Sequence, residues 1–226
     1  EEGKTPKRQE LLALKGVLKD YDVQIGRLVA GLKAMGEYEN TIFIFTSDNG
    51  PAPHFDRLRT DGLRGAKASL YEGGIRMPFF ITWPSHIPAQ VSDERSVVSA
   101  IDLFPSLAKM AGVILPAEYK GDGEDRSSVF FGNPSSRKSD LFLEYGRNNV
   151  AYNYPKEPHR SPNLAIRSGE WKLLVNSDGS DVQLYHITTD ANEVFNKANE
   201  QPKRTDALKK KALAWWQSLP AFEPAK

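Results

Sequence analysis

The chain has 226 residues, of which 39% are hydrophobic and 26% are charged, a composition typical of a globular protein with a buried core. Thirty basic and 29 acidic residues leave a formal net charge of +1, so the charge balance gives no support for nucleic acid or an anionic membrane as a partner. The sequence contains no cysteine, which excludes disulfides, thiolate metal sites and a cysteine nucleophile within these residues. No stretch approaches the roughly 18 to 20 apolar residues of a membrane helix, so no membrane contact is expected.

The first predicted element is a long amphipathic helix. Apolar residues recur at helical spacing over residues 8–34, and Gly36 follows as an end signal. The run at 41–46 comes next, and its β-branched and aromatic residues predict a strand buried on both faces of a mostly parallel sheet. A helix followed by a buried strand is the second half of a βαβ unit, which predicts that the chain begins partway through a domain.

Further along the chain, the sequence predicts a second strand within residues 75–84 and a helix over 96–112 that Gly112 closes. Residues 113–140 are rich in Gly, Pro and Ser and are expected to connect two parts of the chain. Four short apolar runs then predict strands: LFLEY, NLAIR, WKLLVN and VQLYHI. A final helix is predicted over about 202–217.

These elements predict an α/β protein in two parts. Strands 41–46 and 76–82 should share one sheet within residues 1–138. Residues 139–226 should form a smaller antiparallel sheet that packs on the last helix. If the first part is incomplete, its apolar edges predict self-association or a missing partner segment.

Polar residues follow the first strand as "SDNG", residues 47–50. Asn49-Gly50 is a common hairpin turn, but the residues after it, "PAPHFDRLRTDG", carry two prolines and several charges and predict a loop instead of a returning strand. In open α/β sheets, ligands bind where loops leave the carboxyl ends of strands. The sequence therefore favours a site at this strand end over a plain turn.

The next segment, "LRGAKASLYEGGIRMP", places one lysine between glycine-rich stretches. Asp-Asn-Gly, Gly-x-Lys, Glu-Gly-Gly and Arg-x-Pro in this order resemble the sulfatase family of the alkaline-phosphatase-like fold. Downstream, "IDLFPSLAKMAGVILP", "GDGEDRS" and "LYHITTDANEVFN" are similar to further motifs of that family, with departures at Ser106, His186 and Ala191. The resemblance covers most of the chain and implies a mixed sheet with flanking helices, followed by a small antiparallel sheet with a C-terminal helix.

The resemblance implies a calcium site that includes Asp48 and Asn49. Calcium takes about six to eight oxygen ligands, and a carboxylate beside an amide carbonyl supplies two hard oxygen donors. The family's other carboxylates come from an Asp-Asp pair near the amino terminus of the complete enzyme, and no such pair occurs in this chain. We therefore expect Ca²⁺ as the metal and weak binding to these residues alone.

Lys67 matches the family's sulfate-contacting lysine, where an ammonium can stabilise negative charge on the bridging oxygen as the S–O bond breaks. The alternative is an ordinary solvated lysine. His54 lies in the same loop and could contact sulfate or protonate a leaving alcohol, or face solvent. Arg64, beside the Gly-x-Lys motif, could orient the loop or bind an acidic substrate.

The family's nucleophile is a formylglycine made from Cys or Ser in a Cys/Ser-x-Pro-x-Arg motif, and this chain contains no such motif. The resemblance therefore implies a carboxyl-terminal portion of a sulfatase whose amino-terminal half supplies the nucleophile. We expect the chain alone to be inactive. The family also implies a periplasmic or extracellular location.

The segment "EYGRNNVAYNYPKEPHRSPN" is rich in Tyr, Asn, Arg and His between two predicted strands. Aromatic and amide side chains suit a sugar, and Arg147, His159 and Arg160 suit an anionic one, so a sulfated polysaccharide is the predicted substrate class. The alternative is a surface loop. Two other functions stay open: a noncatalytic module that binds sulfated sugar or a partner chain, and a phosphatase or phosphonate hydrolase of the same superfold.

Overall fold

The computed structural model describes residues 8–53, 56–146 and 158–220. These residues form two compact units. The helical unit comprises Thr5–Thr46 and Phe79–Lys138, and the sheet unit comprises Ser47–Pro78 and Ser139–Lys226. The two units therefore divide the chain differently from the predicted domains 1–138 and 139–226, because residues 47–78 pack with the C-terminal part. That domain division of the sequence stays a prediction.

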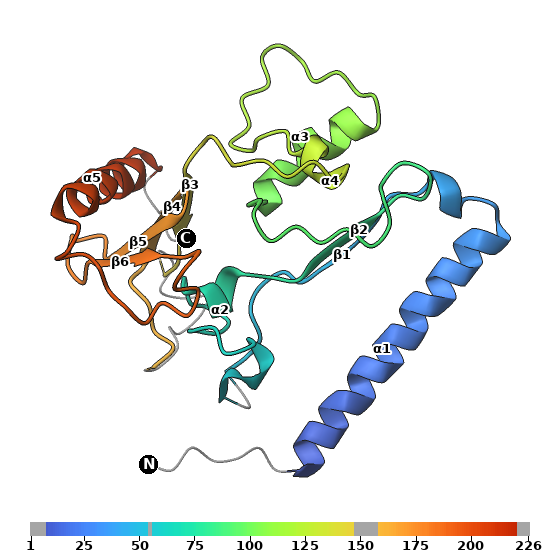
Figure 1. Cartoon of the computed structure of the whole chain (residues 1–226), viewed down its shortest axis with the longest axis horizontal. Coiled ribbons are helices and arrows are strands. Elements are labelled where there is room, and N and C mark those ends of the chain that lie inside the picture. Colours follow the sequence, from blue (N-terminus) through green and yellow to red (C-terminus); the bar gives the residue numbers. More distant parts are fainter. Residues whose placement is uncertain (1–7, 54–55, 147–157, 221–226) are drawn as a thin grey trace, which may run out of the picture. The chain divides into compact units, whose positions relative to one another are not determined.

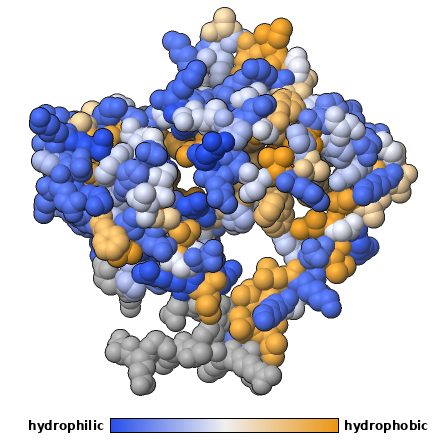
Figure 2. Space-filling model, viewed as in Figure 1, coloured by the Kyte–Doolittle hydropathy of each residue, from blue (hydrophilic) through white to orange (hydrophobic). Residues whose placement is uncertain are grey.

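The helical unit begins with the predicted long helix, α1 (Arg8–Ala34) (Figure 1). Gly36 ends it in the left-handed region at φ +74°, where glycine has no Cβ to clash, and the Glu37 N–H bonds back to the Leu32 carbonyl at 3.0 Å. Several large apolar side chains of α1 are exposed: Leu12, Val17, Leu18, Tyr21 and Leu28. Hydrophobic surface is visible along this helix in Figure 2.

After the short 3₁₀-helix η1 (Tyr38–Asn40), β1 (Phe43–Thr46) pairs with β2 (Phe79–Thr82), which confirms that these two strands share a sheet. The prediction of a mostly parallel sheet with a strand buried on both faces is wrong for the described residues. The two strands pair antiparallel, and Phe43 to Phe45 are only half-buried. An apolar run does not fix the direction of its neighbour, and residues 47–78 between the strands fold in the other unit instead of forming a crossover helix.

The second half of the helical unit contains α3 (Ala100–Met110) and the short α4 (Ser127–Phe130), and Gly112 lies in the left-handed region just after α3. The connecting segment around α4 is tied to α3 by the buried carboxylate of Asp102. This carboxylate accepts the backbone N–H groups of Ser99 and Glu124, each at 2.8 Å, and forms an ion pair with Arg137. The predicted connecting segment is thus held to α3 at Glu124 and Arg137.

The sheet unit contains the predicted small antiparallel sheet, in the order β3 (Leu141–Glu144), β4 (Leu164–Ser168), β5 (Trp171–Val175) and β6 (Gln183–His186). Helix α5 (Pro202–Ser218) covers one face (Figure 1). The side chains between this face and the helix are fully apolar: Leu164, Ile166, Leu173, Val175, Leu184, Leu208 and Ala212. The four strands and the final helix are confirmed.

The opposite face of this sheet carries the alternate residues of the same strands, since side chains point to opposite faces in turn. Ala165, Leu174 and Tyr185 pack there against Leu70 and Tyr71 of the 47–78 segment. The sheet is thereby a platform between α5 and that segment, which also contains η2 (Asp56–Arg59) and α2 (Glu72–Ile75). In the part of the chain that the structure describes, no helix has the length and apolar character to span a membrane.

Candidate active site

Three motifs that are separate in the sequence meet through their backbones in the sheet unit. The Gly50 N–H of Asp-Asn-Gly donates to the Gly74 carbonyl of Glu-Gly-Gly at 2.8 Å. The Lys67 N–H of Gly-x-Lys donates to the Pro51 carbonyl, also at 2.8 Å, and the Gly73 N–H donates to the Arg64 carbonyl at 2.7 Å. The residues around Asp48 and those around Lys67 are therefore fixed against the same short turn.

Glycine is required in this cluster because the backbones touch. A Cβ on Gly50 would lie 2.2 Å from the Gly73 carbonyl oxygen, and one on Gly74 would lie 2.1 Å from the Ser69 carbonyl oxygen. Both distances are far below van der Waals contact with a rigid backbone atom. The glycines of the three motifs thus have a packing role that explains why they occur together.

The side chains that these turns present are exposed or half-exposed. Asp48 is exposed, Asn49 is half-buried, and the Ser47 hydroxyl donates to the Asn49 carbonyl at 3.0 Å. Lys67 is exposed and is followed by Ala68, whose φ of +70° is unfavourable for a residue with a Cβ. Such strain is concentrated at functional turns, and the sequence motifs gave no sign of it at Ala68.

Asp48 and Asn49 fit part of a calcium site by donor chemistry, since both offer hard oxygens. Within the described ranges, however, no group of three or more His, Asp or Glu side chains is arranged to hold a metal ion. Two donors are too few for a complete calcium shell. The metal assignment of these two residues stays a prediction.

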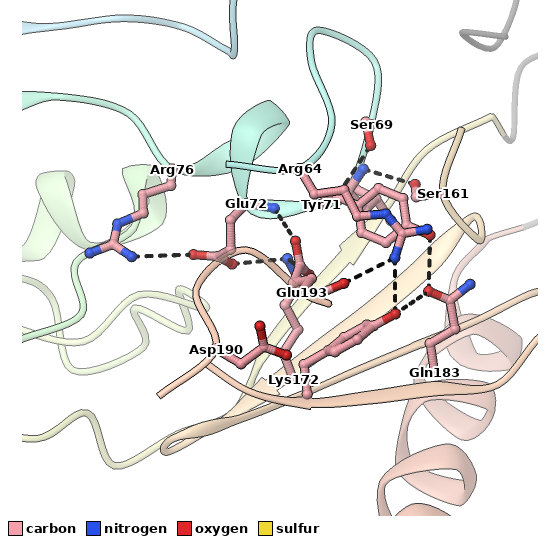
Figure 3. Close-up of polar contacts among 12 residues, drawn as sticks. Arg64, Ser69, Tyr71, Glu72, Arg76, Ser161, Lys172, Gln183, Asp190 and Glu193 are labelled. Atoms are coloured by element: carbon pink, nitrogen blue, oxygen red, sulfur yellow. Dashed lines mark hydrogen bonds and ion pairs between the residues drawn. The ribbon is translucent and has the colours of Figure 1, made fainter. Parts of the chain in front are cut away.

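Arg64 is half-buried and held on the sheet side of the loop (Figure 3). Its guanidinium lies over the Tyr71 ring, 3.9 Å from the centroid, and donates to the Tyr185 hydroxyl at 3.0 Å and to the Glu193 carbonyl at 3.1 Å. These contacts hold the Arg64 side chain against Tyr71, Tyr185 and the Glu193 backbone, and the substrate-binding role of Arg64 stays a prediction. Burial, only partly offset by Arg64, raises the pKa of Tyr185 to about 12, so the hydroxyl stays neutral at physiological pH.

Beneath the turn lies a buried cluster that the sequence reasoning missed, the acid-pair cluster of Glu72, Lys172 and Glu193 (Figure 3). The Lys172 ammonium lies 2.9 Å from Glu72 Oε1 and 2.9 Å from Glu193 Oε1. Glu193 Oε2 accepts the Glu72 backbone N–H at 2.6 Å. The detectable signal was Lys172 itself, a lysine inside the otherwise apolar run "WKLLV".

The pKa values of the two carboxyl groups in the acid-pair cluster are shifted in opposite directions. Burial and the negative charge of Glu72 raise the pKa of Glu193, although Lys172 acts against this. Burial also acts to raise the pKa of Glu72, but the charge and hydrogen bond of Lys172 outweigh it and hold that pKa below its usual value. The lysine is therefore shared unequally, with Glu72 as the more strongly ionised partner.

The other predicted site residues, the catalytic candidate His54 and the substrate-binding candidates Arg147, His159 and Arg160, are only partly described. His54 and Arg147 lie outside the described residues. His159 is half-buried and Arg160 is exposed, and Arg160 lines a polar pocket with Ser161 and Asn163. The Ser161 hydroxyl accepts the Leu70 N–H at 2.9 Å, so this pocket adjoins the segment that carries Lys67. The catalytic role of His54 and the substrate roles of Arg147, His159 and Arg160 stay predictions.

The mixed α/β architecture with its antiparallel sheets agrees with the alkaline-phosphatase-like fold, and the structural neighbours of the chain are sulfatases with that fold. The sulfatase family model matches residues 2–113, and the model of the N-sulphoglucosamine sulphohydrolase C-terminal region matches residues 66–215. The chain belongs to the sulfatase family.

Individual relatives agree with this assignment. Human arylsulfatase A is 35% identical over 166 residues, which are 72% of this chain and 30% of that protein. The N-acetylgalactosamine-6-O-sulfatase of Bacteroides thetaiotaomicron is 29% identical over 212 residues, 83% of this chain and 38% of that protein. The solved structure of BT4656 in complex with its substrate D-glucosamine-2-N,6-O-disulfate superposes with a TM-score of 0.62 at 25% identity, over 87% of this chain and 38% of that one. The chain thus spans about a third of the length of these relatives.

Proposed function

We propose that this chain contributes Lys67, Asp48 and Asn49 to the active site of a sulfuric ester hydrolase that acts on sulfated carbohydrate. The observation that carries the proposal is the backbone junction of Gly50, Lys67 and Gly74, which fixes the acid, the amide and the lysine against one turn. Two of the relatives support the substrate class, because an amino-sugar sulfatase and a complex with a disulfated glucosamine are among them.

Lys67 is the residue of this chain to which we assign a catalytic role. Cleavage of a sulfate ester moves negative charge onto the bridging oxygen, and a fixed ammonium stabilises the transition state more than the ground state. The exposed position of Lys67 on a turn with left-handed residues on both sides, Gly65 and Ala68, suits contact with a substrate.

Two further groups are implied by the family. A bound Ca²⁺, held in part by Asp48 and Asn49, would neutralise charge on the sulfate oxygens. The nucleophile would be a formylglycine from sequence outside these 226 residues, because the chain has no Cys/Ser-x-Pro-x-Arg motif. A phosphatase of the same superfold is the weaker alternative, since the reported relatives are sulfatases.

The chain on its own would then be inactive, and binding of sulfated sugar or of a partner chain is the alternative function. The test joins this chain to an amino-terminal sulfatase region that carries the nucleophile motif and the Asp-Asp pair. We expect turnover of an aryl sulfate and a sulfated saccharide, and little turnover of the matching phosphate ester. Binding of the saccharide without turnover in the joined protein would favour the noncatalytic alternative.

In the active protein, Lys67→Ala should lower kcat/KM by roughly 10² to 10³, as expected for loss of a transition-state donor. Lys210→Ala, at an exposed lysine of α5, is the matched control and should leave kinetics unchanged. Asp48→Ala should be partly rescued by high calcium concentration. Unchanged kinetics in Lys67→Ala would remove the lysine from the mechanism.

A further inference from the structure

The acid-pair cluster holds the first residue of α2 by both its main chain and its side chain. Glu193 accepts the Glu72 N–H at 2.6 Å, although the two residues are 121 positions apart in the sequence. Lys172, on β5, binds the Glu72 carboxylate at 2.9 Å and is paired to Glu193 at the same distance. The start of α2 is therefore attached to β5 through Lys172 and to the loop after β6 through Glu193 (Figure 3).

The other side of this turn holds the two halves of the candidate site. The backbone leaves no room for a Cβ on Gly73 next to the Arg64 carbonyl. It likewise leaves no room for a Cβ on Gly74 next to the carbonyls of Ala66 and Ser69. The Gly74 carbonyl receives the Gly50 N–H at 2.8 Å. A displacement at Glu72 would thus pass directly to the backbone on both sides, toward Asp48-Asn49 and toward Lys67.

Stability alone does not account for this arrangement. Lys172 and Glu193 are 0% exposed and Glu72 is 6% exposed, so three ionisable groups have been removed from water. Replacing a buried ion pair with apolar residues of similar size is often neutral or stabilising, because the cost of removing the charges from water offsets their Coulomb attraction. The cluster does, however, specify one position for Glu72, which an apolar contact would leave less well defined.

We propose that Lys172 and Glu193 are positioning residues for the sulfatase reaction: they fix the Glu72–Gly74 turn and thereby set the positions of Lys67 and of the Asp48-Asn49 pair. The proposal rests on the proposed function for its kinetic consequence. Its structural consequence, that the cluster orders residues 47–53 and 56–75, stands independently of any activity.

The experiment compares Lys172→Met, Lys172→Arg and Glu193→Ala with the control Lys210→Met, in the joined sulfatase. Hydrogen–deuterium exchange should rise in residues 47–75 of Lys172→Met and less or not at all in α5, which packs on the opposite face of the sheet. Because a displacement of about 1 Å at an active site can cost about 10²-fold in rate, kcat should fall by about that factor while KM changes much less. Lys172→Arg should restore part of kcat, and Lys210→Met should behave as the unaltered protein.

Exchange that rises equally in α5 and in residues 47–75, or not at all, would overturn the positioning role, as would unchanged kcat in Lys172→Met. Should Lys172→Met fail to fold, Glu193→Ala removes the acceptor of the Glu72 N–H, and exchange in residues 56–75 must still rise. If the unaltered joined protein hydrolyses no sulfate ester, the proposed function fails, and the exchange measurement alone decides the positioning role.

Discussion

Each compact unit contains a buried cluster in which a carboxylate contacts a basic side chain. The two clusters differ in how they are built. In the helical unit, Asp102 is bound by two backbone N–H groups and by Arg137, all within residues 99–137. In the sheet unit, the Lys172 ammonium forms ion pairs with two carboxylates. Glu72 lies about a hundred residues before Lys172 in the sequence, and Glu193 lies about twenty residues after it.

The comparison separates two uses of buried charge. Asp102 has donors on both carboxylate oxygens, and its contacts close a local loop around α3. The acid-pair cluster instead joins a loop with functional motifs to a distant sheet, and its two acids have opposite pKa shifts. We therefore expect damage to the Asp102 cluster to affect stability, and damage to the acid-pair cluster to affect the geometry of the site as well.

The largest expected effect on stability is that of Asp102→Ala. Removing one partner of a buried pair leaves Arg137, 5% exposed, without its countercharge and removes a hydrogen bond at the start of α3. The free energy of unfolding should fall by about 3–5 kcal/mol in urea titrations. Asp122→Ala, at an exposed aspartate of the same unit, is the control. A loss below about 1 kcal/mol would contradict the assigned role of Asp102.

Gly74→Ala tests the close backbone contacts above the acid-pair cluster. Its Cβ would lie 2.1 Å from the Ser69 carbonyl oxygen, so the turn must shift. Overpacking of this kind should cost about 3 kcal/mol of unfolding free energy and lower activity of the joined sulfatase. Gly16→Ala is the matched control, because nothing lies within 4 Å of a Cβ there and alanine should stabilise α1 by about 0.5–1 kcal/mol. Equal stability of the two variants would show that the turn is not tightly packed.

The pH dependence of stability should distinguish the two acids of the acid-pair cluster. The pKa of Glu193 is raised above 4.5, so its stabilising contribution is complete below that pH and is lost as pH rises toward the native pKa. Glu72 has a lowered pKa, so its contribution is present above pH 4.5 and is lost as pH falls through the native value.

Glu193→Gln should therefore remove the loss of stability above pH 4.5, which comes from Glu193. It should leave the loss of stability below pH 4.5, which comes from Glu72. Relative to the unaltered chain, the unfolding free energy of Glu193→Gln should rise with pH by up to about 1.4 kcal/mol per pH unit in this window. Urea titrations from pH 4 to about pH 7.5 measure the difference. A difference that does not vary with pH would mean that the pKa of Glu193 is the same in the folded and the unfolded chain.

The smallest effect is expected where an ion pair near the Asp102 cluster is exposed. Lys109 binds Asp125 at 2.7 Å, but its side chain is 67% exposed. Water screens such a pair, so Lys109→Ala should change the unfolding free energy by less than about 0.5 kcal/mol. A loss comparable to that of Asp102→Ala would show that distance, and not burial, determines the contribution of these pairs.

Much of the secondary structure was predictable because it depends on local pattern. The spacing of apolar residues and the end signals at Gly36 and Gly112 predicted α1 and α3, and short apolar runs between turn signals predicted β3 to β6. The direction of β1 was not predictable. An apolar run shows that a strand is to be buried, but the partner strand and its direction depend on where the connecting segment folds.

The candidate site divides in the same way. Asp48, Asn49 and Lys67 were predicted because each lies inside or beside a short glycine-containing motif that resembles the sulfatase pattern. By itself, the sequence determined these motifs, the helix ends and the four strands, since all of them depend on residues a few positions apart. Only the tertiary structure decided that Glu193 caps Glu72 and that Lys172 lies between them, because these contacts require the register of β5 and β6 and a burial that removes competing water.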